Sequence, residues 1–309
     1  MNKIVAVAGP TAVGKTKFAI EIAKKFNGEI VSCDSMQLYK YMDIGSAKPT
    51  EEEIAQVKHH LIDFIDPRDD FSVAQYQSLA KKAIKDILNQ EKLPVISGGT
   101  GLYLNSIIYE MDFSRSCRDI DYRKELEHIA AQQGSQALHN MLERADKEAS
   151  LSIHPNNTKK IIRALERIHQ GEGKIKAFKD IKQETRDYDT VIIGLTRNRQ
   201  ELYERINQRV DVLMQTGLLD EVKALLDKGL TPEHISMKAI GYKEIMDYFL
   251  GKYDLETAVD KVKKNTRHYA KKQLTWFRRY DKIKWYNISD FNDDEDALES
   301  IVKWLEKKI

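Results

Sequence analysis

The sequence contains little cysteine and no long apolar run, and each scarcity excludes a class of protein. Cys33 and Cys117 are the only cysteines in 309 residues, too few for a disulfide framework or a cysteine-rich zinc site. The apolar run at residues 4–8 is far too short for a signal sequence or a membrane span. We therefore expect a folded, cytoplasmic protein in a reducing compartment that does not associate with a membrane.

The net charge of the chain is also small. The formal net charge is only +2 at pH 7, although 32% of the residues are charged and 41% are hydrophobic, proportions that are ordinary for a soluble globular protein. The balance hides an uneven distribution, because a dense basic helical stretch and then an acidic tail occupy the C-terminal third. The length predicts one large domain or two.

A glycine-rich stretch directly after the first apolar run is the strongest local signal. It fits the pattern G-x-x-x-x-G-K-[ST] and consists of Gly9, Pro10, Thr11, Ala12, Val13, Gly14, Lys15 and Thr16. The glycines let backbone N–H groups curve around phosphate oxygens, while Lys15 adds a positive charge and the Thr16 hydroxyl can bind Mg²⁺. The stretch predicts a site for a diphosphate or triphosphate, without indicating whether a phosphate is transferred, is hydrolysed or leaves.

The apolar periodicity predicts a P-loop NTPase-like α/β fold, in which helices flank a parallel sheet. Strands are expected at residues 4–8, 29–32, 59–66, 93–97, 190–195 and 284–288. Helices are expected at residues 15–26, 51–58, 72–90, 102–109, 198–225, 240–249, 254–280 and 293–308. Ser72 and Gln75 predict a capping box at the start of the third of these helices, and the helix at 198–225 is expected to break near Gly217. Between residues 113 and 189 the patterns are only helical, at 122–133, 136–144 and 158–169. We therefore expect a core domain of residues 1–112 and 190–309 and a mainly helical insertion domain of residues 113–189.

Polar residues after the strands mark the ligand-binding edge of the expected sheet. Asp34 and Gln37 follow the second strand, and the glycines within residues 98–101 would let a ligand approach the backbone after another strand. Arg205 and Arg209 lie one helical turn apart, so both could reach a phosphate. These residues are the first candidates for a site beside the phosphate loop.

Two expected helices carry basic faces. The face on 158–169 consists of Lys159, Arg163 and Arg167, and the face on 254–280 consists of Lys264, Arg267, Lys271 and Arg278. Each could be a solvated surface, but two basic faces beside a phosphate loop favour RNA. The inward stripe of the second helix is expected to contain Val259, Val262, Thr266, Tyr269, Ala270, Gln273 and Phe277. Three other tyrosines are either base-stacking residues or parts of the core, with the core favoured: Tyr39, Tyr103 and Tyr242.

Several separated segments resemble one family, the bacterial tRNA dimethylallyltransferases. They are residues 9–16 (GPTAVGKT), 34–39 (DSMQLY), 42–49 (MDIGSAKP), 60–67, 98–103 (GGTGLY), 163–166 (RALE), 239–242 (AIGY), Arg267 and 273–276 (QLTW). The resemblance implies that the exocyclic amine of the adenosine on the 3′ side of the tRNA anticodon attacks dimethylallyl diphosphate and that diphosphate departs. Eukaryotic relatives append a C2H2 zinc finger, for which this chain does not have the cysteines.

The resemblance also implies roles for individual residues. Residues 9–16 would hold the diphosphate, with Mg²⁺ on Thr16, and Arg209 together with Arg205 would contact it. Asp34 would act as general base on the amine, although its position also suits an outer-shell ligand of Mg²⁺. The residues implied to contact tRNA are Asp34, Ser35, Met36, Gln37, Thr100, Arg123, Lys159, Lys160, Ile161, Ile162, Arg163, Lys238, Ala239, Ile240, Gly241, Tyr242, Lys243 and Arg267. The implied catalytic group is Lys15, Thr16, Asp34 and Thr100.

Elementary chemistry agrees with these roles. Charge develops on an allylic diphosphate as its C–O bond stretches, and Lys15, Mg²⁺ and backbone N–H groups would stabilise that charge. An adenine amine is a poor nucleophile, so a carboxylate that takes its proton is worth roughly 10²- to 10⁴-fold in rate.

Three other functions stay open at this point. A small-molecule P-loop kinase would use the same loop but would not need the insertion or the basic helices. An adenylate isopentenyltransferase would act on free nucleotide, and a nucleotide-regulated RNA-binding protein would not need Asp34. We favour an enzyme that is a monomer and binds the tRNA anticodon stem-loop, dimethylallyl diphosphate and Mg²⁺.

Overall fold

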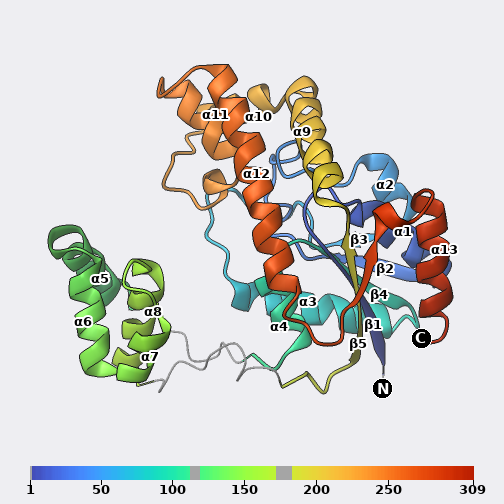
Figure 1. The fold of residues 1–309 in the computed structure, drawn as a ribbon, viewed down its shortest axis with the longest axis horizontal. Helices are drawn as coiled ribbons and strands as arrows, with labels where there is room; N and C mark the ends of the chain where they lie inside the picture. The colour runs from blue at the N-terminus through green and yellow to red at the C-terminus, as the bar shows by residue number, and fades with distance from the viewer. Residues whose placement is uncertain (1, 112–118, 172–182) are drawn as a thin grey trace. The chain divides into compact units, whose positions relative to one another are not determined.

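The computed structural model describes residues 2–111, 119–171 and 183–309, which form two compact units (Figure 1). Unit 1 comprises Met1–Ile108 and Thr185–Ile309, and unit 2 comprises Tyr109–Glu184. The boundary expected after residue 112 and the residue Cys117 lie outside the described residues. The expected boundary at residue 190 lies five residues after the start of the second part of unit 1 at Thr185.

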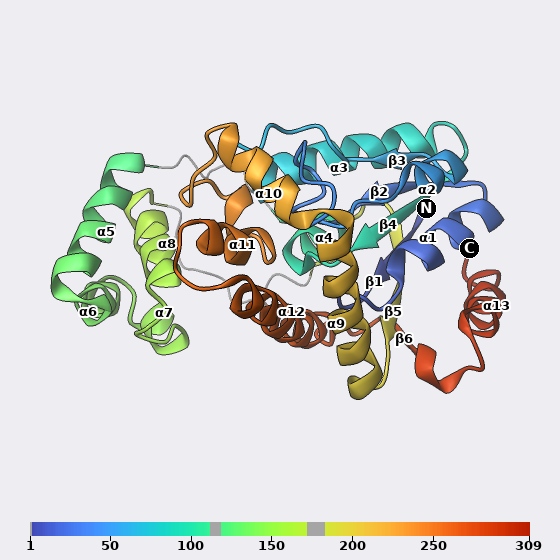
Figure 2. The ribbon, with the colours of Figure 1, turned by 90° about the horizontal axis from the view of Figure 1, so that it is seen from above.

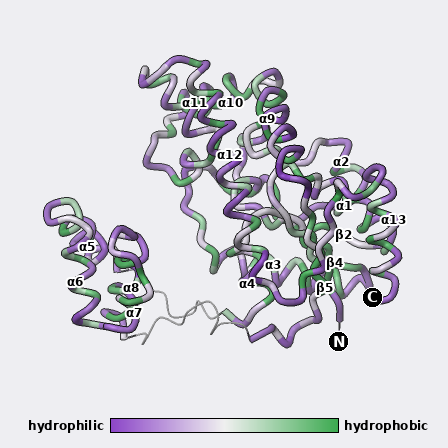
Figure 3. Tube along the Cα trace, viewed as in Figure 1, coloured by the Kyte–Doolittle hydropathy of each residue, from purple (hydrophilic) through white to green (hydrophobic). Residues whose placement is uncertain are grey.

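Unit 1 is built on one parallel sheet, as the sequence predicts. In the described part of the chain the sheet has six strands in the order β3-β2-β4-β1-β5-β6. Their bounds are β1 Lys3–Ala8, β2 Gly28–Ser32, β3 His59–His60, β4 Leu93–Gly98, β5 Asp189–Thr196 and β6 Lys284–Asn287. Central β1 pairs with β4 on one side and β5 on the other, so that Val5 lies opposite Val95 and Val191. Its apolar residues are buried, and Figure 3 shows hydrophobic colour along the central strands.

Crossover helices cover both faces of this sheet. Helix α1 (Lys15–Lys25) leads from β1 outward to β2, and α3 (Val73–Leu88) leads from the edge strand β3 back to β4. Right-handed crossovers that run in opposite directions place their helices on opposite faces, as Figure 2 shows. Ser72 begins α3 with the predicted capping box, in which its hydroxyl accepts from the Gln75 N–H. The carboxyl ends of β1, β2 and β4 therefore meet at one edge.

The strand expected at residues 59–66 is much shorter in the structure. Only His59–His60 pairs with β2, after the short helix α2 (Glu51–Gln56). Leu61 and Asp63 then adopt positive φ angles of 60° and 58°, which an extended strand cannot contain. The stretch turns there, and Ile65 returns to form a single bridge with Tyr39.

Helix α4 (Gly101–Ile108) follows β4, and the C-terminal part of unit 1 is mostly helical, with its last helix α13 beside α1 (Figure 2). The bounds in this part are α9 Arg199–Thr216, α10 Leu218–Asp227, η2 Ser236–Lys238, α11 Tyr242–Phe249, α12 Leu255–Phe277, η3 Ile288–Asp290 and α13 Asp294–Leu305. Gly217 separates α9 from α10 with a φ of 111°, at the predicted break. On α12, Val262, Ala270 and Phe277 are buried as expected, whereas Tyr269 of the same stripe is 37% exposed.

Unit 2 has its own apolar core. It contains α5 Ile120–Gln133, α6 Ser135–Ala145, α7 Lys147–Ser152 and α8 Thr158–His169, of which only the short α7 was not predicted. Leu126, Leu142 and Leu165 pack in this core together with Ile161 and Ile162, which are 0% and 3% exposed. The two isoleucines therefore do not present side chains to RNA, and their assignment as tRNA-contacting residues is corrected to a structural role.

Candidate active site

The phosphate loop lies where β1 enters α1. Gly14 precedes the helix in the left-handed region with a φ of 108°, and Lys15 is the first helical residue. Gly9 lies so close to β5 that a Cβ atom there would be 2.6 Å from the carbonyl oxygen of Leu195. The N-terminus of α1 has no side-chain cap, so its first N–H groups are free of such a partner and suit an anion.

The ends of β2 and β4 meet beside this loop. Gly98 approaches Cys33 so closely that a Cβ atom would lie 2.1 Å from the Cys33 carbonyl oxygen. The same carbonyl accepts a hydrogen bond of 3.1 Å from the N–H of Thr100, and the Thr100 hydroxyl accepts one of 3.0 Å from the N–H of Ser35. Asp34 lies between these contacts, and its Oδ1 accepts a hydrogen bond of 2.9 Å from the N–H of Met36. Sequence reasoning thus placed Asp34 and Thr100 correctly at the same edge.

Charged side chains converge at this edge. Burial lowers the pKa of Lys15 to about 8; the charge of Asp34 opposes this shift and that of Arg209 adds to it. The pKa of Arg209 is also lowered by burial, again with Asp34 opposing. Asp34 is therefore the carboxylate that acts on both desolvated cations, and Glu53 acts in addition on Arg209. A bound anion would supply the missing negative charge, which is what a diphosphate does.

Three arginines on or just before α9 make different contacts. Arg205 donates from Nε to the carbonyl oxygen of Ala12 at 3.1 Å, so it supports the loop from its carbonyl side. Arg197, which sequence reasoning did not select, donates from Nε to the carbonyl oxygen of Val13 at 3.2 Å and pairs with Asp294 at 2.6 Å. The sequence feature that could have identified Arg197 is its position directly after β5. Arg209, in contrast, acts on Lys15 and Asp34, and it is the α9 arginine that the site electrostatics single out.

Gln273 of α12 joins the two loops of the site. Its Oε1 accepts a hydrogen bond of 2.8 Å from the N–H of Thr11, and its Nε2 donates one of 3.0 Å to the carbonyl oxygen of Gly99. A Cβ atom on Gly99 would lie 2.2 Å from that Nε2, and one on Gly101 would lie 2.2 Å from the Trp276 ring. The space beside these glycines, which was expected to let a ligand approach the backbone, is therefore occupied by side chains of α12. The segment that begins at Gln273 was noticed in the sequence, but this role was not.

The polar residues after Asp34 hold the neighbouring loop. Gln37 accepts from the Ser32 hydroxyl at 2.9 Å and donates to the carbonyl oxygen of Ala47 at 3.1 Å, so both ends of its amide are engaged. The carboxylate of Glu221 accepts from the N–H groups of residues 43, 44 and 45 at 2.8, 2.7 and 3.0 Å. It also accepts from the hydroxyl of buried Tyr242 at 2.6 Å. Tyr242 therefore has an internal role, and its side chain does not face RNA.

The remaining expected RNA contacts are spread over both units. On unit 2, three basic side chains of α8 are exposed: Lys159, Lys160 and Arg163. Arg123 of the same unit pairs with Glu127 at 3.1 Å and Glu166 at 3.5 Å. On unit 1, Arg267 donates to Asn207 at 2.5 Å. Around η2 and α11, Lys238 and Lys243 are exposed, Ala239 and Ile240 are half-buried, and Gly241 is buried.

Protein-only metal sites are absent from the part of the chain that the structure describes, because no group of three or more His, Cys, Asp or Glu side chains could hold an ion there. Mg²⁺ does not need such a cage when phosphate oxygens and water supply most ligands. Thr16, half-exposed at the start of α1, offers one oxygen beside the loop. The only described cysteine, Cys33, is buried, and burial raises the pKa of its thiol to about 12.

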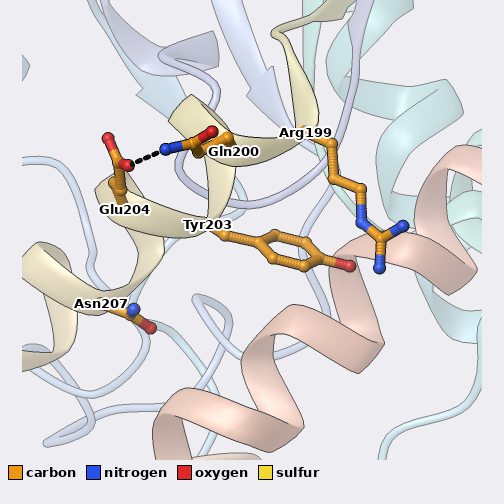
Figure 4. Close-up of a pocket in the computed structure, with 5 residues that line it drawn as sticks. All are labelled: Arg199, Gln200, Tyr203, Glu204 and Asn207. Carbon is orange, nitrogen blue, oxygen red and sulfur yellow. Dashed lines mark hydrogen bonds between the residues drawn. The ribbon is translucent and has the colours of Figure 1, made fainter.

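A surface hollow on α9 is separate from this site (Figure 4). Its lining residues are Arg199, Gln200, Tyr203, Glu204 and Asn207. The guanidinium of Arg199 lies 5.2 Å from the centre of the Tyr203 ring. None of these residues belongs to the phosphate loop, and Arg205 and Arg209 project from a different side of the helix. The hollow therefore does not mark the reaction centre.

Comparison with known proteins assigns the family. Residues 37–280 match the sequence model of IPP transferase. The chain belongs to the IPP transferase family. It is 49% identical, over 98% of its length and 96% of the relative, to a tRNA dimethylallyltransferase of Alkaliphilus oremlandii. It is 46% identical, over the full length of both chains, to one from Clostridioides difficile.

Solved structures of the family have the same fold. The tRNA isopentenylpyrophosphate transferase of Bacillus halodurans is 45% identical, with a TM-score of 0.74 over 100% of this chain and 98% of that one. A eukaryotic dimethylallyltransferase captured acting on tRNA is 29% identical, with a TM-score of 0.77 over 90% of this chain and 70% of that one. Among the helices described here, none is both long and apolar enough to cross a membrane.

Proposed function

We propose that the protein transfers the dimethylallyl group of dimethylallyl diphosphate to the exocyclic N6 amine of the adenosine on the 3′ side of the tRNA anticodon, with release of diphosphate. The observation that carries this proposal is the meeting of Lys15, Arg209 and Asp34 at one sheet edge in a member of this family. The family relatives named for this reaction match the chain over nearly its whole length.

The two cations serve the leaving group. As the allylic C–O bond stretches, negative charge moves onto the diphosphate, and Lys15 and Arg209 are already desolvated beside it. Electrostatic stabilisation by preorganised groups is usually the largest catalytic contribution. Mg²⁺ held by the Thr16 hydroxyl and the phosphate oxygens would supply further positive charge to the same oxygens.

Asp34 serves the nucleophile. Its Oδ1 is fixed by the Met36 N–H at 2.9 Å, which leaves its other oxygen available to accept the N6 proton. The proton lost by the amine goes to Asp34, the new C–N bond replaces the C–O bond, and the diphosphate carries away the electron pair. Thr100, tied to Ser35, keeps the strand end that bears Asp34 in place.

The exposed basic residues of α8 are proposed to hold the RNA backbone. Lys159, Lys160 and Arg163 are free of the unit 2 core, in contrast to Ile161 and Ile162 between them. Phosphate contacts of this kind give salt-dependent affinity and little sequence preference.

A label-transfer experiment tests the proposal. The protein is incubated with Mg²⁺, dimethylallyl diphosphate labelled in the prenyl group, and tRNA that carries unmodified adenosine beside the anticodon. We expect label on that adenosine. Label on free AMP or ATP instead, or phosphate transfer from ATP without prenylation, would show an adenylate isopentenyltransferase or a kinase and overturn the proposal.

A further inference from the structure

The tyrosines that the sequence offered as stacking residues are not accessible to a base. Tyr39, Tyr103 and Tyr242 are 1%, 6% and 0% exposed. Tyr103 stacks on Tyr76 with ring centres 3.9 Å apart, and the Tyr242 hydroxyl is held by Glu221. An extruded purine needs an aromatic or apolar face to replace the stacking that it loses in RNA. That face has to come from another residue.

Tyr269 has the required position. It lies on α12 one turn before Gln273, whose amide contacts both Thr11 and Gly99. Its side chain is 37% exposed, although its helical phase falls on the inward stripe. This combination arises where an inward-facing helical position meets an open site instead of packed core.

The phenol end of Tyr269 reaches the reacting groups. Burial of the hydroxyl and the charge of Asp34 raise its pKa, while hydrogen bonding with Thr100 and Gln273 acts against that rise. The hydroxyl thus lies near Thr100, Gln273 and Asp34, in a residue that is 37% exposed. A tyrosine fixed at its polar end presents that ring with little freedom.

We propose that the ring of Tyr269 is the stacking wall for the extruded adenine, and that Thr100 and Gln273 hold its hydroxyl so that the N6 amine of the base is directed at Asp34. This inference rests on the proposed function and adds the surface that receives the acceptor. It makes Tyr269 a substrate-contacting residue for RNA and not for the diphosphate, whose proposed partners are Lys15 and Arg209.

Kinetics of three variants test the inference. Tyr269→Ala removes the ring, Tyr269→Phe keeps it without the hydroxyl, and Phe249→Ala removes a comparably exposed ring on α11, 36% exposed. We expect Tyr269→Ala to raise KM for tRNA roughly tenfold or more, since base–aromatic stacking is worth that much. The dissociation constant for dimethylallyl diphosphate, measured by calorimetry without RNA, should stay unchanged. Tyr269→Phe should restore most of the tRNA affinity, and Phe249→Ala should behave as wild type.

A fluorescence measurement separates stacking from a structural role. Binding is followed with an anticodon stem-loop that carries 2-aminopurine at the target position, whose emission is quenched by stacking. We expect quenched emission with the wild type and Tyr269→Phe and brighter emission with Tyr269→Ala at saturating protein. Equal emission from all three, or a rise in the donor dissociation constant in place of KM for tRNA, would overturn the stacking role while leaving prenyl transfer intact. If the wild type itself does not prenylate tRNA, both proposals are wrong.

Discussion

Replacement of Gln273 by alanine should lower both the stability of unit 1 and its affinity for the prenyl donor, dimethylallyl diphosphate. The Gln273 side chain is 5% exposed and makes hydrogen bonds of 2.8 Å with the Thr11 N–H and 3.0 Å with the Gly99 carbonyl. Truncation of Gln273 leaves the Thr11 N–H and the Gly99 carbonyl without their hydrogen-bond partner, and an unsatisfied buried group costs about 1–3 kcal/mol. Some water will enter beside Thr11. We therefore expect a loss of about 2–4 kcal/mol in the free energy of unfolding.

Tryptophan fluorescence during urea unfolding measures this effect in unit 1 alone. The three tryptophans of the chain are Trp276, Trp285 and Trp304, and all belong to unit 1. Calorimetric titration of the protein with dimethylallyl diphosphate in the presence of Mg²⁺ measures the affinity for the prenyl donor. Its dissociation constant should rise roughly tenfold because the phosphate loop loses its hydrogen bond with Gln273. Gln208→Ala, an exposed substitution on α9, is the matched control. An unfolding free energy within about 0.5 kcal/mol of the wild type, together with unchanged donor affinity, would refute the reasoning.

Three further perturbations follow from the charged groups. Because the pKa of Lys15 is lowered to about 8 and an anion favours its charged form, donor affinity measured by calorimetry should fall about tenfold per pH unit above pH 8; a flat profile to pH 9.5 would contradict this. Glu221→Ala leaves three backbone N–H groups and the Tyr242 hydroxyl without their acceptor. It should therefore lower the free energy of unfolding, measured in urea, by about 2–4 kcal/mol; a loss under about 0.5 kcal/mol would contradict this role of Glu221. Although burial alone would raise it, hydrogen bonds from Lys92 and His60 lower the pKa of Glu29 to about 2 from 4.5, so its contribution is present above pH 4.5 and is lost as the pH falls towards 2. Wild-type stability should therefore drop more steeply between pH 5 and pH 3 than that of Glu29→Gln, by up to about 2 kcal/mol, and parallel curves would show that the carboxylate is not stabilised.

The parts of the fold that the sequence predicted well are those set by local patterns. The buried strands, the capping box at Ser72 and the break at Gly217 depend on nearby residues, and all three occur as expected. The short α7 and the turn after His60 were not predicted, because a six-residue helix shows little periodicity and the positive φ of Leu61 is set by the surrounding loop.

The site was predicted where strand ends determine it and not where distant segments meet. Asp34 and Thr100 follow β2 and β4, so parallel pairing alone brings them together. The contact of Gln273 with Thr11 joins segments 262 positions apart, which no local pattern reveals. Tyr269 was placed on the inward stripe of α12, but helical periodicity identifies only a face and not whether packed side chains or an open site lies against it.

Several expectations of the sequence stay predictions. They are Mg²⁺ as the metal, the cytoplasmic location, the monomeric state, and the contacts of Arg123, Lys159 and Arg267 with tRNA. Charge reversal of exposed Lys159 and Arg163 should lower the salt dependence of tRNA binding if these residues contact phosphates.

The most direct test of the central claim is the single-turnover rate of prenyl transfer with enzyme in excess, compared for the wild type and Asp34→Asn. The asparagine keeps the size of the side chain but cannot take the N6 proton. With donor and tRNA dissociation constants shown to be unchanged, and Asp86→Asn on the exposed face of α3 as control, the account predicts a loss of roughly 10²-fold or more in the rate of label transfer to the anticodon-adjacent adenosine. A wild-type rate in Asp34→Asn would contradict it.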